Sequence, residues 1–241
     1  LPLLALFAMT LTAGETPFSG KFMALIGNSV WVASAAAVVC AAAALWLAYA
    51  ERLYPQRLMR GGVRVATLGY AVPGLVLAVA LMLPMTSLDK WIATALRDAL
   101  DIHWGLLLTG TSAALIFVYV ARFLTVAFNS TQAGLIQIHP QLDAAARSLG
   151  HSPGSVLRRV HLPLLRPAIL TGLLLVFIDV MKELPATLIL RPFNFETLAT
   201  WVYRYASDER LAEASTAALA IVLVSLVPTV MLSLSRRWGA D

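Results

Sequence analysis

Residues 29–50 read SVWVASAAAVVCAAAALWLAYA, an apolar run that contains no charged residue. A helix needs about 20 apolar residues to cross a bilayer, so this run predicts a membrane-spanning helix. Similar runs lie at residues 65–84, 104–124, 167–184 and 214–235, although the run at 167–184 is apolar only as far as Asp179. Residues 1–13 are apolar but too short, and we expect them to be the end of a span whose start lies outside the sequence. The predicted fold class is an all-α, polytopic transmembrane helical bundle, with the whole chain, 1–241, as one domain.

The composition supports this interpretation. Hydrophobic residues make up 59% of the chain and charged residues 13%, and the mean hydropathy is +0.79. Soluble domains carry about 25% charged residues, so a soluble fold is excluded, and so is a disordered chain. The single cysteine, Cys40, excludes an intrachain disulfide. The first residue is Leu1 rather than methionine, which is typical of a fragment of a longer chain.

Basic residues are divided unevenly between the two sides of the predicted bundle. Cytoplasmic loops of membrane proteins carry an excess of Lys and Arg. One side has eleven such residues: Arg52, Arg57, Arg60, Arg64, Arg122, Arg147, Arg158, Arg159, Arg166, Arg236 and Arg237. We expect this side to be cytoplasmic, with the C-terminus inside, in a multi-pass membrane protein. The basic excess is then explained without a nucleic-acid partner.

Small residues mark two packing features within the spans. Ala33, Ala37 and Ala41 form a small-xxx-small row that lets helices approach closely, although an alanine-rich helix without a special partner has the same pattern. Gly69 and the Pro73-Gly74 pair predict a kink or local unwinding in the span at 65–84. Outside the spans, residues 88–100 have the spacing of an external helix, and the amphipathic segment 185–213 is expected at the outer membrane surface.

The predicted cytoplasmic loop, residues 125–166, contains signals for two short helices. Pro140 suits the first position of a helix, and Gly150 suits the left-handed residue that ends it. Ser152 suits the N-cap and Pro153 the first position of a second helix, which is expected to run to Leu162-Pro163. The sequence therefore predicts two short helices joined by a tight turn on the cytoplasmic face.

The same loop resembles the signature of the inner-membrane permeases of ATP-binding-cassette importers. That signature is Glu-Ala-Ala, three residues, Gly, nine residues, Ile, one residue and Leu-Pro. Every spacing fits here, but Ala144 stands where Glu is usual, with Asp143 one position earlier, and Val160 replaces Ile. The resemblance implies a type I importer permease fold and a loop that docks on an ATPase subunit. The implied coupling residues are Asp143, Ala144, Ala145, Ala146, Gly150, Ser152, Pro153, Leu162 and Pro163.

The resemblance also implies other partners: an external (periplasmic) substrate-binding protein, a second permease half, fused or separate, and membrane lipid. ATP hydrolysis would belong to the separate ATPase subunit, so this chain is not expected to be an enzyme or to hold a cofactor. Residues 69–74 (GYAVPG) and 182–187 (KELPAT) resemble the ferric-iron-type permeases, in particular their C-terminal half. Ferric iron is therefore the implied substrate, and the related thiamine and polyamine permeases supply alternatives.

Three ionisable residues lie at the outer end of the span at 167–184. Asp179 and Lys182 are three positions apart, so they share a helix face and can pair, and Glu183 follows directly. These residues are candidates for a gate or a polar lining of the translocation path, or for an interfacial cluster with Lys182 reaching water. Arg122 is interpreted as an orientation anchor, and His161 as a contact or surface residue of the loop.

Two other classes of function remain as alternatives. A secondary transporter driven by an ion gradient would place several ionisable residues near the midplane, whereas the clear spans here are almost free of charge. An intramembrane enzyme would need catalytic motifs, and the sequence has no zinc motif, nucleophile elbow or phosphate-binding loop. No metal site is predicted.

Overall fold

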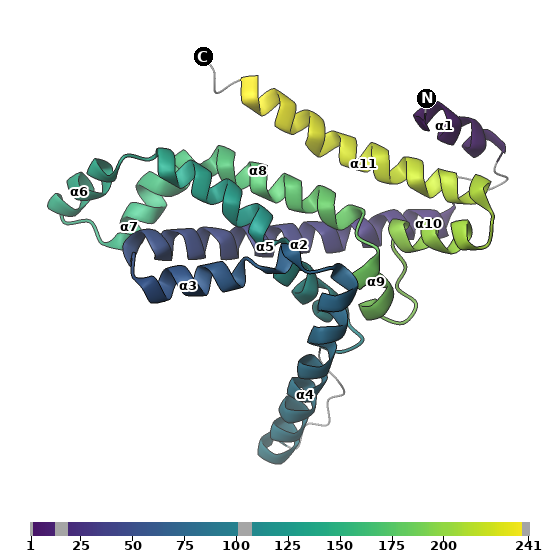
Figure 1. The fold of residues 1–241 in the computed structure, drawn as a ribbon, viewed down its shortest axis with the longest axis horizontal. Helices are drawn as coiled ribbons and strands as arrows, with labels where there is room; N and C mark the ends of the chain where they lie inside the picture. Colours follow the sequence, from purple (N-terminus) through teal and green to yellow (C-terminus); the bar gives the residue numbers. More distant parts are fainter. Residues whose placement is uncertain (1, 13–18, 101–107, 238–241) are drawn as a thin grey trace.

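The computed structural model describes residues 2–12, 19–100 and 108–237, and within them all regular structure is helical. Three long helices pack side by side as the core: α2 (Gly20–Leu53), α5 (Ser112–Gln137) and α8 (Leu162–Met181) (Figure 1). The predicted row of small residues lies inside this packing, with Ala33 and Ala37 fully buried and Ala41 7% exposed. Alanine side chains let the neighbouring backbones approach closely, so the row is a helix–helix contact.

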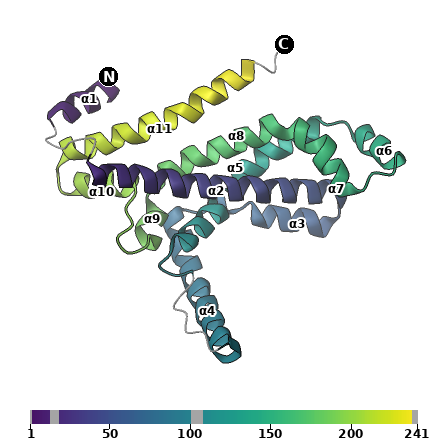
Figure 2. The same ribbon diagram turned by 180° about the vertical axis from the view of Figure 1, so that it is seen from behind.

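A second group of helices lies at one end of this core. Helix α11 (Leu211–Arg237) packs against the short α1 (Pro2–Thr12) and against α10 (Leu198–Ser207). The short helix α9 (Pro185–Leu190) follows α8 and precedes α10 in the chain, and it packs on α4 and α5. Figure 2 shows α1, α10 and the start of α11 together at this end, opposite α6 and α7.

The predicted span at 65–84 is broken in the structure, as Gly69 and Pro73-Gly74 indicated. Helix α3 (Arg57–Ala66) ends before the 3-10 turn η1 (Gly69–Ala71), and α4 (Gly74–Leu100) starts in a new direction, away from the core (Figures 1 and 2). A Cβ on Gly69 would lie 1.8 Å from the carbonyl oxygen of Ala121. Only glycine allows that approach. The predicted kink or local unwinding is therefore confirmed. The prediction of a separate helix at 88–100 was wrong, because α4 continues through these residues.

Two other predicted boundaries were wrong. The run at 104–124 begins on residues 104–107, which lie outside the described part, and its helix α5 continues to Gln137. Thr131 and Gln132 lowered the hydropathy of that part, but Thr131 bonds the carbonyl of Ala127 and Gln132 donates to Glu51 of α2. These polar groups are satisfied inside the protein, which a count of apolar residues does not reveal.

The predicted start of a span at residue 167 was also wrong. Helix α7 (Pro153–Val156), the π-helical turn η2 (Leu157–His161) and α8 form one continuous helical segment. In the described part of the chain, five helical segments, including this one, are long and apolar enough to cross a membrane.

Candidate functional site

The predicted pair of short helices forms at the end of the core where α2 ends (Figure 1). Helix α6 (Pro140–Ser148) has Pro140 in its first turn, and the Nδ1 atom of His139 accepts the backbone N–H of Gln141. Gly150 has a φ of 79° and donates its N–H to Arg147, while the next N–H, of His151, reaches the carbonyl of Ala146. This pair of hydrogen bonds is the Schellman ending of a helix, which needs glycine at the left-handed position.

The second short helix starts as its sequence predicts. The hydroxyl of Ser152 caps α7 by accepting the N–H of Ser155 at 3.4 Å, and Pro153 occupies the first turn. Most of the predicted coupling residues are exposed, and the exceptions are Asp143, which is half-buried, and Ala146, which is buried. The exposed ones are Ala144, Ala145, Gly150, Ser152, Pro153, Leu162 and Pro163. The loop thus offers a free surface to a partner.

Asp143 points inward and binds two side chains that the sequence did not single out as site residues. Its Oδ2 atom accepts a hydrogen bond from Nε of Arg52 at 2.9 Å and forms an ion pair with Nη2 of Arg52 at 2.7 Å. Its Oδ1 atom lies 2.5 Å from Nε2 of His161. His161 is fully buried, so its interpretation as a contact or surface residue was wrong. The π-helical turn that ends at His161 carries the ring inward, and the sequence gives no periodic signal for such a turn.

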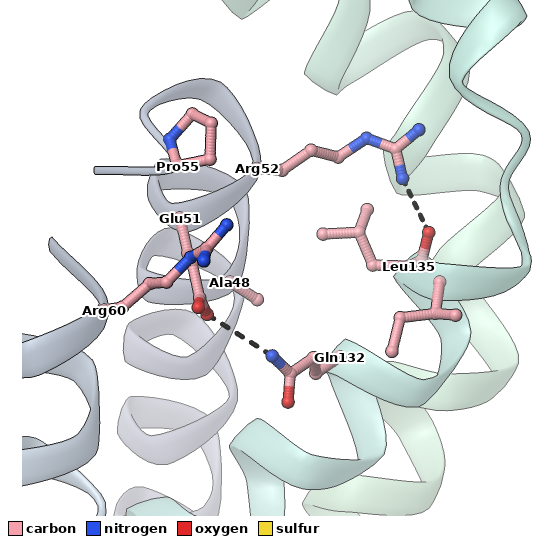
Figure 3. Close-up of a pocket in the computed structure, with 8 residues that line it drawn as sticks. Ala48, Glu51, Arg52, Pro55, Arg60, Gln132 and Leu135 are labelled. Atoms are coloured by element: carbon pink, nitrogen blue, oxygen red, sulfur yellow. Dashed lines mark hydrogen bonds between the residues drawn. The ribbon is translucent and has the colours of Figure 1, made fainter. Parts of the chain in front are cut away.

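Arg52, at the end of α2, joins this network to a third helix. Its Nη1 donates to the carbonyl of Leu135 at 2.6 Å, and its Nη2 to the carbonyl of Ile138 at 2.9 Å, at the end of α5. Figure 3 shows the guanidinium of Arg52 reaching Leu135 across the space between α2 and α5, with the Gln132–Glu51 hydrogen bond beside it. In the sequence, Arg52 was one of many basic loop residues, so its role was not visible.

The carboxyl of Asp143 is stabilised in its charged form. Burial raises the pKa of this group, but the hydrogen bonds from Arg52 and His161 lower it by more, and the pKa lies below the ordinary value of 3.8. On the other side of the ring, the hydroxyl of Tyr49 donates to the carbonyl of Pro153 at 2.7 Å, and its ring packs on His161. Helices α2, α6 and α7 therefore meet at one polar cluster.

The predicted gate residues divide into two separate pairs. Asp179 and Lys182 pair as predicted, with 2.9 Å between Oδ1 and Nζ, and Lys182 is 63% exposed. Glu183 instead faces Arg122, with 3.6 Å between Oε1 and Nη1, and it accepts the N–H of Ala186 at the start of α9. The structure does not bring the three predicted residues into one cluster.

Arg122 lies in the middle of α5, so its interpretation as an anchor at the end of a span was wrong. Its Nε and Nη1 atoms are buried and make no hydrogen bond. A Cβ on Gly74 would lie 1.6 Å from this Nη1 and 2.7 Å from Oε1 of Glu183. The guanidinium therefore fills the space that glycine leaves at the start of α4, and the pair lies where α4, α5 and α9 converge.

Among the described residues, no group of three or more His, Cys, Asp or Glu side chains could hold a metal ion. The carboxylate of Glu196 pairs with Arg204 at 2.7 Å and with Arg191 at 3.4 Å.

Comparisons with known proteins match this chain to membrane components of transport systems. The family model described as "Binding-protein-dependent transport system inner membrane component" matches residues 41–238. An Fe(3+)-transport system permease protein of Haemophilus influenzae is 31% identical over 88% of this chain and 39% of its own length. A putative 2-aminoethylphosphonate transport system permease protein of Salmonella choleraesuis is 28% identical over 86% of this chain and 71% of its own.

A solved structure agrees with these sequence matches. The crystal structure of a bacterial alginate ABC transporter, in complex with an alginate pentasaccharide-bound periplasmic protein, contains a chain that superposes with a TM-score of 0.71. The match covers 98% of this chain and 88% of that one at 16% identity. At that identity the similarity supports the fold. The chain spans 39% of the length of the iron-transport relative, whose remaining part has no counterpart here.

Proposed function

The chain belongs to the family of binding-protein-dependent transport system inner membrane components, the permeases of ATP-binding-cassette importers, and we propose that it forms one half of a path that carries ferric iron across the inner membrane. Residues 1–241 act in this proposal as a single permease domain. An ion-gradient transporter and an intramembrane enzyme are both disfavoured by the family membership.

The observation that carries the coupling part of the proposal is the exposed loop around Gly150. Its helices are capped and rigid at their ends, while its outer face, which includes Ala144 and Ala145, has no partner within the described chain. A rigid, exposed element at one end of a bundle is suited to dock in the groove of another protein. We assign that role to a separate ATPase subunit, which also supplies ATP hydrolysis.

The proposed mechanism is alternating access. ATP binding closes the ATPase subunits, the loop moves with them, and the helices change from an inward-open to an outward-open arrangement. Such coupling requires that ATP and the loaded binding protein prefer different states. The binding protein docks at the end that carries α10, where Phe193 is 94% exposed. A second permease half, surrounded with this one by lipid, completes the path.

Ferric iron is supported by the iron-transport relative, which is 31% identical over 88% of this chain. The Arg122–Glu183 pair is the proposed polar gate for it, because Glu183 supplies a hard oxygen donor of the kind that ferric iron prefers. The more exposed Asp179–Lys182 pair would line the outer approach to this gate.

A second candidate is an anionic substrate, 2-aminoethylphosphonate. The observation that favours it is Arg122, whose buried Nε and Nη1 atoms lack acceptors. Arginine binds phosphate-like oxygens through its N–H groups, so the oxygens of a phosphonate passing the gate would supply acceptors that these atoms lack. A thiamine or polyamine cation would be attracted only by the carboxylate of Glu183, because Arg122 has the same charge sign as the cation.

Uptake into proteoliposomes distinguishes these substrates. The full-length protein is assembled with its ATPase subunit and binding protein, and accumulation of ⁵⁵Fe(III) and of radiolabelled 2-aminoethylphosphonate is measured. We expect ATP-dependent iron uptake that falls in Glu183→Gln and not in the matched control Asp98→Asn, which neutralises an exposed carboxylate of α4. Uptake of the phosphonate alone, lost in Arg122→Gln, would overturn the iron assignment in favour of the second candidate.

A further inference from the structure

Helix α6 has little apolar packing to hold it in place. Ala146 is its only buried residue within the described chain, while Ala144 and Ala145 face away from the protein. A helix of nine residues is marginal on its own in water. The position of α6 is therefore fixed by the polar contacts of Asp143 and by the Schellman turn at Gly150.

Those polar contacts lead to all three helices of the core. Arg52 belongs to the last turn of α2 and also holds the carbonyls of Leu135 and Ile138 at the end of α5. His161 is the residue directly before α8. One guanidinium, one carboxylate and one imidazole thus connect α6 to α2, α5 and α8.

The geometry of these contacts suits the transmission of force. The Arg52–Asp143 contact combines a hydrogen bond with an ion pair on one carboxylate oxygen, and charge-assisted hydrogen bonds are shorter and stronger than neutral ones. His161 is fully buried, so it cannot follow Asp143 without a shift of the surrounding helix. A displacement of α6 would therefore move the core instead of being absorbed by a soft loop.

We propose that Arg52, Asp143 and His161 form a latch, with Arg52 as the positioning residue that converts movement of the loop into movement of the spans. This inference rests on the proposed coupling function and names the residues inside the chain that carry it. The latch does not use position 144, so it operates although Ala144 stands where the related permeases have Glu.

The test uses the full-length transporter, assembled with its ATPase subunit and binding protein in proteoliposomes. The transported probe is ferric ion or 2-aminoethylphosphonate, whichever the unchanged transporter accumulates. Arg52→Met is expected to keep the ATPase subunit bound and hydrolysing ATP, while transport per ATP falls about tenfold, within the range of coupling energies between sites. The matched control is Arg57→Met, an exposed arginine on the neighbouring helix.

A pair of variants at His161 keeps the test decisive if Arg52→Met does not assemble. Glutamine retains a side-chain N–H donor for Asp143, and leucine of similar volume removes it. His161→Gln is expected to restore most of the transport per ATP that His161→Leu loses. The latch would be overturned if His161→Gln and His161→Leu had equal transport per ATP. It would also be overturned if transport per ATP in Arg52→Met were within twofold of the Arg57→Met control.

The two proposals fail in different ways. If the unchanged protein binds no ATPase subunit, the coupling function itself is wrong, and the variants need not be measured. If the unchanged protein binds the ATPase and transports, but the Arg52 and His161 variants do the same with equal efficiency, the latch alone is wrong.

Discussion

Two glycine residues, Gly69 and Gly74, determine how closely η1 and the start of α4 approach the core. At Gly69 a side chain would collide with backbone, the carbonyl oxygen of Ala121, whereas at Gly74 it would meet the end of the Arg122 side chain. Backbone cannot yield without moving a helix, but a guanidinium can rotate away. The two glycines therefore protect different features: the helix contact and the Arg122–Glu183 pair.

These positions predict an order of stability for three alanine variants. Gly69→Ala should lower the midpoint of thermal unfolding in detergent the most, since overpacking costs about 1–3 kcal/mol. Gly74→Ala should lower it less and should abolish the effect of Glu183→Gln on uptake. Gly27→Ala, in α2 with open space around it, is the control and should be neutral or stabilising, because alanine is the better helix former. Equal midpoints for the Gly69 and Gly27 variants would contradict the close approach.

Asp143 predicts how the latch responds to pH. Its pKa is lowered in the folded protein, so its contribution to stability is present above the ordinary carboxyl value of 3.8 and is lost as the pH falls below that value toward the folded pKa. A spin label at Leu149, which is 77% exposed, should stay ordered down to about pH 4 and become mobile at lower pH. In Asp143→Asn the label should be mobile at every pH. A label ordered equally in both proteins would contradict the role of the carboxylate.

At the scale of elements, the sequence predicted helix existence better than helix ends. The clear runs at 29–50 and 214–235 lie inside α2 and α11, because they continue without a charged residue. Helix α5 was cut short at residue 124 because its last turns are polar in composition but satisfied by partners on α2 and within α5. Hydropathy does not distinguish a solvated polar group from one that is bonded inside the protein.

The caps of the short helices were predictable and the π-helical turn was not. The caps depend only on the residue at each position and its immediate neighbours, so the sequence was sufficient to predict the roles of Pro140, Gly150 and Ser152. The turn η2 inserts an extra residue into a helix, and no local propensity signals it. The position of His161, and with it half of the latch, therefore required the structure.

That extra residue supplies an element-scale prediction. Deletion of Arg159, which is exposed within η2, should remove the extra residue and restore ordinary helical geometry, so that His161 loses the position that the π-helical turn gives it. The contact with Asp143 should then be lost, and transport per ATP should fall as in His161→Leu. Arg159→Ala is the matched control and should behave like the unchanged protein, as measured by the ratio of uptake to ATP hydrolysis. Normal coupling in the deletion variant would contradict the role of the turn.

At the scale of the whole molecule, the two groups of basic residues that the sequence assigned to opposite sides of the membrane lie at opposite ends of the structure. The end of the molecule that carries α6 and α7 also has the last turn of α2, with Arg52, and the start of α3, with Arg57 (Figure 1). The opposite end has the start of α2, with Lys21, and α10, with Arg204. Arg122 was counted with the first group but lies in mid-helix. Removing it leaves the asymmetry intact, so the orientation with α6 inside remains the prediction.

Cysteine labelling measures this orientation. The chain has one cysteine, the buried Cys40, so single exposed cysteines can be introduced with little background. A membrane-impermeant maleimide should label Phe193→Cys in intact spheroplasts and Leu149→Cys only after permeabilisation. The reverse pattern would place the loop outside and exclude its contact with a cytoplasmic ATPase.

The central claim is that the loop around Gly150 binds an ATPase subunit, and an affinity pull-down from native membranes tests it most directly. Gly150→Trp places a bulky residue at a left-handed position, strained by about 1–2 kcal/mol, where no atom of the chain would collide with a Cβ. Gly150→Asn tolerates the same backbone and serves as the control. We expect an ATPase to co-purify with the unchanged and Asn proteins and to be lost with the Trp protein. Absence of any ATPase from the unchanged protein, or equal recovery with Trp, would contradict the account.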